Sequence, residues 1–192
     1  MNTPRSIAQD YVSRLRNVLA ELDLDAVAAA TAVLLDAYEN GHTVFICGNG
    51  GSASTASHMA ADLGKNTVAA GKPRLRVLSL NDNMAWFSAL ANDLGYENVF
   101  VEQMGNLLQP QDVLIVLSAS GNSPNVVQAA EFAKAHGGRI LALVGFQGGR
   151  LRELADVAIH VKCDAYGPVE DVHLVLNHIF TEALRQRIRS AP

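Results

Sequence analysis

Five short, continuously apolar segments, each followed by a stretch with helical character, are the feature that most restricts how this chain can fold. They lie at 43–47, 76–80, 112–117, 139–144 and 157–161. Strands of a parallel sheet are apolar throughout because helices cover both faces of the sheet. Right-handed crossovers between such strands build a doubly wound sandwich. We therefore predict a three-layer α/β fold with a five-stranded parallel sheet.

Helices are expected at both ends of this core. Within 1–40, apolar residues recur at spacings of three and four, and an acidic break at 23–25 divides the stretch into two helices. A long last helix is predicted from about 168 to 189. No linker, repeat or low-complexity segment interrupts the chain. We therefore predict a single domain over 1–192, with an N-terminal helical pair at 1–40 and an α/β core at 41–192.

Charge and cysteine content argue against several classes of protein. Nineteen acidic and fifteen basic side chains give a formal net charge of −4, so the sequence lacks the electrostatic signature of a nucleic-acid partner. No run approaches the roughly 18 apolar residues of a membrane span, so no membrane partner is predicted. Cys47 and Cys163 lie in separate apolar segments, and we predict two buried, unpaired thiols. A soluble, cytoplasmic protein is expected.

Two of the predicted strands run directly into loops of small polar residues that open helices. The first loop is GNGGS at 48–52, and the second is SASGNS at 118–123. Backbone N–H groups converge in such a loop, the helix dipole favours an anion there, and serine hydroxyls add donors. Phosphate suits this arrangement. The alternative is that these residues only form turns and helix caps, but two such loops after two strands favour a phosphate site.

This loop pair resembles that of the sugar isomerase (SIS) domain family, and within it the phosphoheptose isomerase group. The resemblance extends over essentially the whole chain and implies a flavodoxin-like SIS fold. The family's usual Thr in the second loop is Ala119 here, so one hydroxyl contact is expected to be missing. The resemblance implies a sugar phosphate whose phosphate is held by Ser52, Ser118, Ser120 and Ser123, with Asn49 and Asp82 near the sugar and further contacts from Gly50, Gly51 and Glu170.

Histidines and carboxylates on two predicted helices form a second group of candidates. His58 and Asp62 are four residues apart, and Glu170 and His178 are eight apart, so each pair lies roughly on one helix face. Aldose–ketose isomerisation needs a base beside the carbonyl and an acid for the oxygens. A divalent metal held by imidazoles and carboxylates polarises that carbonyl. Singly, such residues are more often structural, and we interpret His173 in this way.

The phosphoheptose isomerases carry a matching set, with zinc in at least some members. By resemblance, His58, Asp62, Glu170 and His178 would hold a divalent metal, zinc, and His178 would also transfer protons. Asp62 stands where the family has a Glu that acts as ligand and base, and Glu170 stands where the family commonly has a Gln. Asp62 is shorter by one methylene, whereas Glu170 adds a charge that favours a cation. The catalytic set would be His178, Asp62 and Glu170, and which carboxylate is the base stays open.

Two functions remain open on this basis. The first is a metal-assisted isomerase that converts sedoheptulose 7-phosphate to D-glycero-D-manno-heptose 7-phosphate or acts on a near relative of that sugar. The second is a non-catalytic SIS protein that binds sugar phosphates or associates with a replication initiator. The retained histidines and carboxylates favour the enzyme, and the shortened acid at Asp62 is the best argument against it. Metal content and an isomerase assay would separate the two.

An apolar stripe on the predicted N-terminal helices bears on assembly. One small sandwich would not fully cover the stripe, and exposed apolar patches of this kind usually mark interfaces. Together with the resemblance, this predicts a closed homotetramer with sites at subunit interfaces. The stripe consists of Ile7, Tyr11, Leu15 and Val18.

Overall fold

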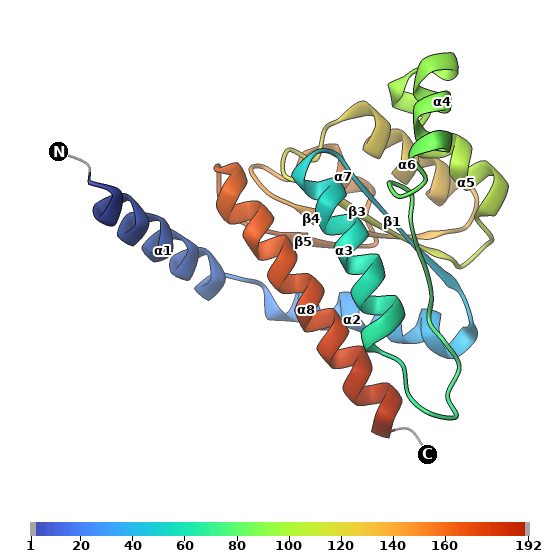
Figure 1. Cartoon of the computed structure of the whole chain (residues 1–192), viewed down its shortest axis with the longest axis horizontal. Helices are drawn as coiled ribbons and strands as arrows, with labels where there is room; N and C mark the ends of the chain where they lie inside the picture. Colours follow the sequence, from blue (N-terminus) through green and yellow to red (C-terminus); the bar gives the residue numbers. More distant parts are fainter. Residues whose placement is uncertain (1–2, 191–192) are drawn as a thin grey trace.

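The computed structural model describes residues 3–190 and contains one sheet of five parallel strands (Figure 1). The order in the sheet is β2-β1-β3-β4-β5. The predicted five-stranded parallel sheet is therefore confirmed. The predicted domain extent of 1–192 stays a prediction, and its residues 1–2 and 191–192 lie outside the described part. The strands are β1 (Thr43–Gly48), β2 (Arg76–Ser79), β3 (Val113–Ser118), β4 (Arg139–Val144) and β5 (Val157–His160).

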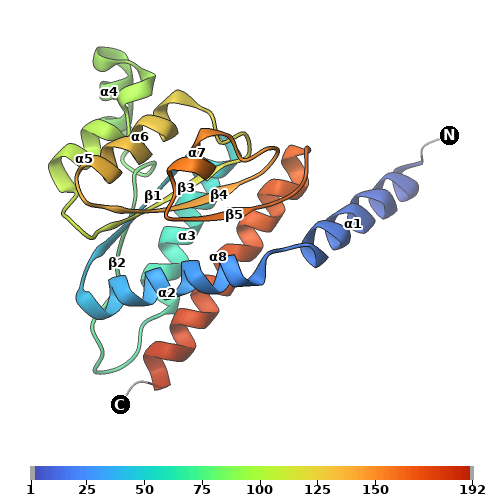
Figure 2. The ribbon, with the colours of Figure 1, turned by 180° about the vertical axis from the view of Figure 1, so that it is seen from behind.

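Helices cover both faces of the sheet, as Figures 1 and 2 show from opposite sides. Residues of the two helical layers fall into two separate apolar cores, one on each face. The first layer consists of α2 (Leu24–Asn40), α3 (Gly51–Asn66) and α8 (Tyr166–Ser190). The second layer consists of α5 (Val101–Leu107), α6 (Pro124–Ala135) and α7 (Gly149–Leu154), with α4 (Met84–Leu94) and the 3-10 helix η1 (Tyr96–Asn98) beside them.

Alternate residues of the central strand enter opposite cores. In β3, Ile115 belongs to the core shared with α2, α3 and α8, whereas Leu114 and Val116 belong to the core of the other layer. Every residue of β3 is buried. This burial on both faces explains why the strand segments are apolar throughout and show no alternation of polar and apolar residues.

The first helix, α1 (Pro4–Ala20), has no buried residue and extends away from the sheet (Figures 1 and 2). The Tyr11 hydroxyl donates a hydrogen bond of 2.6 Å to Asp171 on α8. Gly167 permits this approach, since a Cβ there would lie 2.7 Å from the Tyr11 hydroxyl oxygen. The hydrogen bond to the Asp171 carboxylate raises the pKa of Tyr11 to about 12. Of the predicted stripe, Leu15 and Val18 pack against the core, whereas Ile7 is 55% exposed.

The elements that the sequence did not predict are short. The predicted strand limits agree with the structure within one residue at each end, and the last helix begins two residues earlier than predicted. The helices α5, α7 and η1 were not predicted as separate elements with their own limits, because each is too short to show a helical period. Cys163 is partly exposed, so its predicted burial is wrong, while Cys47 is buried, which raises the pKa of its thiol. None of the described helices has the length and apolar character needed to cross a bilayer.

The buried His173 gives the fold a specific dependence on pH. This side chain is 1% exposed, and burial lowers its pKa to about 4. An unfolded histidine has a pKa near 6.5, so the unfolded chain binds the proton more readily between these two values. His173 should therefore lower the free energy of unfolding by roughly 3 kcal/mol as pH falls from about 6.5 to about 4. In urea titrations, the free energy of unfolding of His173→Phe should change less between pH 6.5 and pH 4 than that of the wild type. An equal change in both proteins would contradict this role of His173.

Candidate active site

Two loops at the centre of the sheet enclose a pocket. β1 and β3 are adjacent and parallel, with Gly48 paired to Leu117, so the loops that follow them leave the same edge of the sheet. The strand order reverses here, and open α/β sheets bind ligands at such a point. The pocket has a volume of about 300 Å³ and is lined by Asn49, Gly50, Gly51, Ser52, Leu117, Ser118, Ala119, Ser120, Ser123, Tyr166 and Glu170. We call it the loop pocket.

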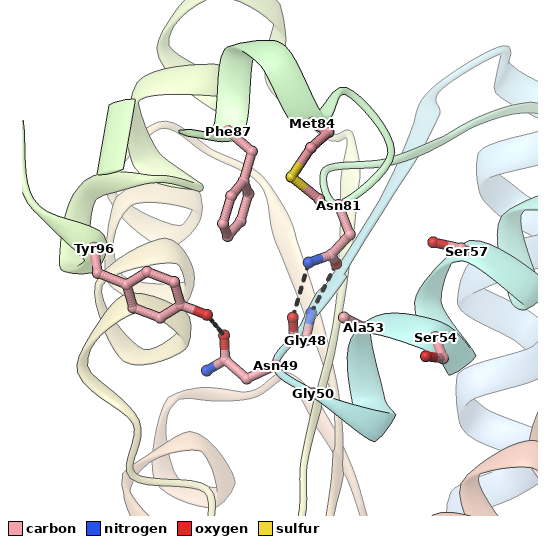
Figure 3. Close-up of a pocket in the computed structure, with 10 residues that line it drawn as sticks. All are labelled: Gly48, Asn49, Gly50, Ala53, Ser54, Ser57, Asn81, Met84, Phe87 and Tyr96. Carbon is pink, nitrogen blue, oxygen red and sulfur yellow. Dashed lines mark hydrogen bonds between the residues drawn. The ribbon is translucent and has the colours of Figure 1, made fainter. Parts of the chain in front are cut away.

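Side-chain amides fix the first loop in place. Asn49 and Asn125 exchange two hydrogen bonds of 2.8 Å. The Tyr96 hydroxyl also donates to Asn49, at 2.9 Å (Figure 3). Asn81 accepts from the N–H of Gly48 at 3.2 Å and donates to its carbonyl at 2.9 Å. Because these bonds use both ends of the amides, they hold the loop in one conformation before any ligand arrives.

A second pocket, of about 310 Å³, lies beside the first loop (Figure 3). Ser54 and Ser57 of α3 line it, together with an apolar wall formed by Met84, Phe87 and Tyr96. The loop residues Asn49 and Gly50 line both pockets. The first loop therefore separates two cavities, and a ligand bound at the loop can extend to either side.

The serines of the second loop differ in what they already bind. The Ser118 hydroxyl accepts from the N–H of Gly121 at 3.1 Å, so Ser118 helps to form the turn. Ser120 accepts more weakly, from the N–H of Asn122 at 3.4 Å. Ser123 is the N-cap residue of α6, yet its side chain makes no capping hydrogen bond. The turn-and-cap interpretation thus accounts for Ser118 and leaves the Ser123 hydroxyl available to a ligand.

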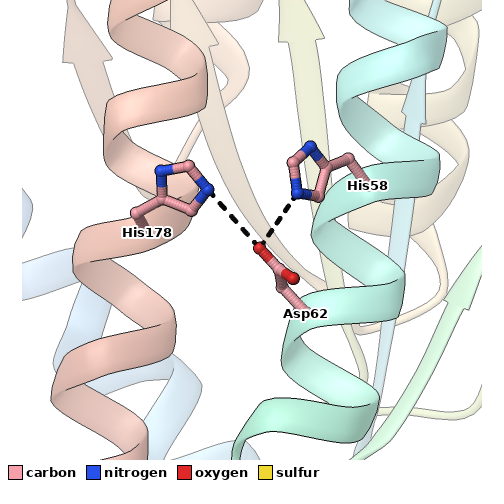
Figure 4. A group of neighbouring side chains, drawn as sticks. All are labelled: His58, Asp62 and His178. Carbon is pink, nitrogen blue, oxygen red and sulfur yellow. Dashed lines mark ion pairs between the residues drawn. The ribbon is translucent and has the colours of Figure 1, made fainter.

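His58, Asp62 and His178 form a compact group between α3 and α8 (Figure 4). Oδ2 of Asp62 lies 3.2 Å from Nε2 of His58 and 3.6 Å from Nε2 of His178. The candidate ligand atoms all lie within 4.8 Å of one another. Two imidazoles and a carboxylate suit zinc, and three protein ligands leave a position open for substrate or water. The histidine side chains are 47% and 58% exposed, so a divalent metal could reach and occupy this group.

Glu170 does not join this group. Its carboxylate lies over the start of α3, where a Cβ on Gly51 would be 2.6 Å from Glu170 Oε1. There it lines the loop pocket and makes no hydrogen bond or ion pair with any residue in the described range 3–190. Asp62, by contrast, accepts hydrogen bonds from Asn66 at 2.9 Å and from Asn177 at 2.8 Å. The structure therefore separates the two candidate carboxylates, and the metal role of Glu170 stays a prediction.

Asp82 lies outside both pockets. It is exposed and accepts a hydrogen bond from the Ser57 hydroxyl on α3. Ser57 lines the second pocket, so Asp82 is linked to that pocket through this hydrogen bond. Its predicted place near the sugar stays a prediction.

Comparison with known proteins shows the family of this chain. A SIS domain model matches residues 9–145, well over half of the chain. The chain belongs to the SIS domain family. It is 41% identical over 187 residues to lincomycin biosynthesis protein LmbN of Streptomyces lincolnensis, covering 92% of this chain and 68% of LmbN. It is also 36% identical over 174 residues to a phosphoheptose isomerase of Chlorobaculum parvum, covering 90% of this chain and 83% of that enzyme.

A solved SIS structure confirms the predicted fold class. Phosphoheptose isomerase GmhA from Neisseria gonorrhoeae has a TM-score of 0.89 to this chain at 26% identity. The alignment covers 96% of this chain and 100% of that one. The resemblance expected from the two loops is therefore confirmed, and the three-layer arrangement with it.

Several residues that shape the SIS site were not singled out from the sequence. Asn125 was missed because it is 76 residues from Asn49, the residue it bonds, so no local pattern links the two. Asn177 stands beside His178 on α8 and looks from its spacing like an ordinary helix residue. Asn81 did carry a usable signal, because a polar residue directly after a buried strand lies at the edge where such sheets bind ligands.

Two glycine-to-alanine substitutions should separate pocket changes from folding changes. At Gly121, φ is 67° and a Cβ would lie 2.0 Å from the carbonyl oxygen of Gly148, which is rigid backbone. Gly121→Ala should therefore lower the free energy of unfolding by about 1–3 kcal/mol or more. At Gly51 the three atoms nearest to the added Cβ all belong to the flexible end of Glu170, so Gly51→Ala should fold normally but weaken substrate binding. Thermal melts and KM measurements check both variants. Equal stabilities of Gly121→Ala and Gly51→Ala would contradict the close backbone packing at Gly121.

Proposed function

We propose that this chain is an aldose–ketose isomerase that converts sedoheptulose 7-phosphate to D-glycero-D-manno-heptose 7-phosphate. Relatives that carry the name phosphoheptose isomerase match it over most of both chains. The observation that carries the proposal is that two helices each serve both parts of the site. α3 supplies Ser52 to the loop pocket and Asp62 to the histidine group, and α8 supplies Glu170 and His178 in the same way. The same two helices thus hold an anion site and the proton-transferring groups.

The loop pocket is the proposed phosphate site. Ser120 and Ser123 offer hydroxyls, and the N-termini of α3 and α6 point backbone N–H groups toward an anion. Hydrogen bonds to a charged acceptor contribute about 1.5–3 kcal/mol each, which is enough to anchor a sugar phosphate. Ala119 offers no hydroxyl, so the second loop relies on its serines and backbone.

The isomerisation itself is a proton transfer between neighbouring carbons. A base removes a proton from C1 of the ketose and returns a proton to C2, while the hydroxyl proton on O1 leaves and O2 gains one. We assign the base to Glu170, because its carboxylate faces the loop pocket and binds no other group among residues 3–190. Asp62 already accepts from two amides and contacts two imidazoles. His178, with its exposed ring, is assigned the transfers at the oxygens.

His58, Asp62 and His178 are proposed to hold a divalent metal, zinc. The donor set of two imidazoles and one carboxylate supports this, as does their spacing within 4.8 Å. When bound, such an ion polarises the sugar carbonyl. Asp62 supplies the negative charge that retains the cation, and the amides of Asn66 and Asn177 keep this carboxylate oriented.

A homotetramer in the cytoplasm is proposed as the working form. α1 leaves Ile7 and Val12 more than half exposed. A largely apolar groove that includes Val175 and Ile179 lies beside His178 on the outer face of α8. Both surfaces suit coverage by another copy of the chain, which would place sites at subunit interfaces. The two unpaired cysteines are consistent with a reducing compartment.

Substitution of His178 tests the enzyme assignment. His178→Gln should lower kcat for sedoheptulose 7-phosphate by at least ~10²-fold, the usual loss when a general acid or base is removed. His58→Gln should mainly weaken the metal, so excess Zn²⁺ should restore part of the activity. The matched control is His136→Gln, because His136 is an exposed histidine that lines neither pocket. A wild-type protein that binds the sugar phosphate without converting it would instead favour the binding-protein function.

The assembly is tested by charging the exposed side of α1. Ile7→Asp combined with Val12→Asp should shift the sedimentation coefficient from that of a tetramer to a smaller species, because an interfacial charge is left unpaired. Asp10→Asn on the same helix should leave the tetramer intact. A wild-type chain that sediments as a stable monomer at micromolar concentration would rule the tetramer out.

A further inference from the structure

The Asp62 carboxylate is held more firmly than either histidine beside it. Asn66, one turn further along α3, donates to Oδ1 at 2.9 Å. Asn177 on α8 donates to Oδ2 at 2.8 Å, and Oδ2 is the oxygen that also faces His58 and His178. The two amides together fix both carboxylate oxygens, and only the bond from Asn177 crosses between the helices.

Asn177 makes this contact from a fully buried position. Its exposure is 0%, and its own Oδ1 has no hydrogen-bond partner among residues 3–190. Leaving a buried acceptor unpaired destabilises a fold, and an apolar side chain of similar shape would avoid that loss. Thr181, one turn further along the same face of α8, is likewise buried, and its hydroxyl makes no hydrogen bond to Asp62 or to any other residue of the described part. An amide whose oxygen is left unpaired at such a site suggests that Asn177 serves a purpose other than stability.

We propose that Asn177 is a positioning residue that sets the Asp62 carboxylate between His58 and His178 for a divalent cation; this rests on the proposed metal role of that group. The side chain of Asp62 is short, so its reach depends on which rotamer it adopts. The Asn177 amide selects the rotamer that turns Oδ2 toward both imidazoles. Because Asn177 immediately precedes His178, the same turn of α8 orients the carboxylate and one of its partner imidazoles.

Asn177→Leu tests this role, with Thr181→Val as the matched control. Leucine has the same number of side-chain heavy atoms with the same branching, cannot donate, and removes the unpaired buried acceptor, so the variant should still fold. The probe is Co²⁺ alone, followed by its visible spectrum. Asn177→Leu should raise the Co²⁺ dissociation constant on the order of 10–100-fold and change the spectrum, as expected when an outer hydrogen bond to a ligand is lost. Thr181→Val should alter neither.

The outcomes separate this role from a merely structural one. Wild-type affinity and spectrum in Asn177→Leu would overturn the proposal, and so would an equal loss in both variants. If the wild type takes up no Co²⁺, the metal part of the proposed function fails, and crystal structures of the metal-free proteins decide the positioning role. An Asp62 carboxylate that keeps its orientation in Asn177→Leu then overturns the role, and one that turns away from the two imidazoles supports it.

Discussion

The parallel pairing of β1 with β3 is the constraint on which the site depends. This pairing places the ends of two strands 70 residues apart in sequence at one edge of the sheet, with Gly48 opposite Leu117. The relative position of the two loops that line the loop pocket follows from that register. A shift of one residue would turn the buried side chains of β3 to the wrong layer and would move the two loops relative to each other. The core and the ligand site are thus fixed by the same hydrogen bonds.

Two helices that begin at this edge of the sheet connect the loop pocket to the histidine group. α3 begins in the first loop, and α8 packs beside it, so each helix reaches from the loop pocket to the histidine group (Figures 1 and 4). Polar residues lie along the buried face of α8, where apolar ones would pack better. His173, Asn177 and Thr181 recur every four residues there. Burial of this kind weakens the fold locally, and proteins commonly retain it beside functional sites.

The sequence predicted the parts of this structure that depend on short-range patterns. Continuously apolar segments identified the five strands, and glycine- and serine-rich stretches after two of them identified the loops. It could not predict the amide pair of Asn49 and Asn125, since the contact forms only when two loops meet across the sheet. Helical spacing placed Glu170 and His178 roughly on one face of a helix. Eight residues also span about 12 Å along the helix axis, so the two side chains reach different parts of the site.

That separation gives the two carboxylates different surroundings. A carboxylate surrounded by donors is held in one orientation, which suits a metal ligand, whereas a carboxylate without donors in a pocket is free to contact a bound substrate. Asp62 belongs to the first kind, with two amides and two imidazoles around it. Glu170 belongs to the second, over the first turn of α3. The two acids therefore differ in what surrounds them: Asp62 is held by amides between α3 and α8, whereas Glu170 faces the loop pocket.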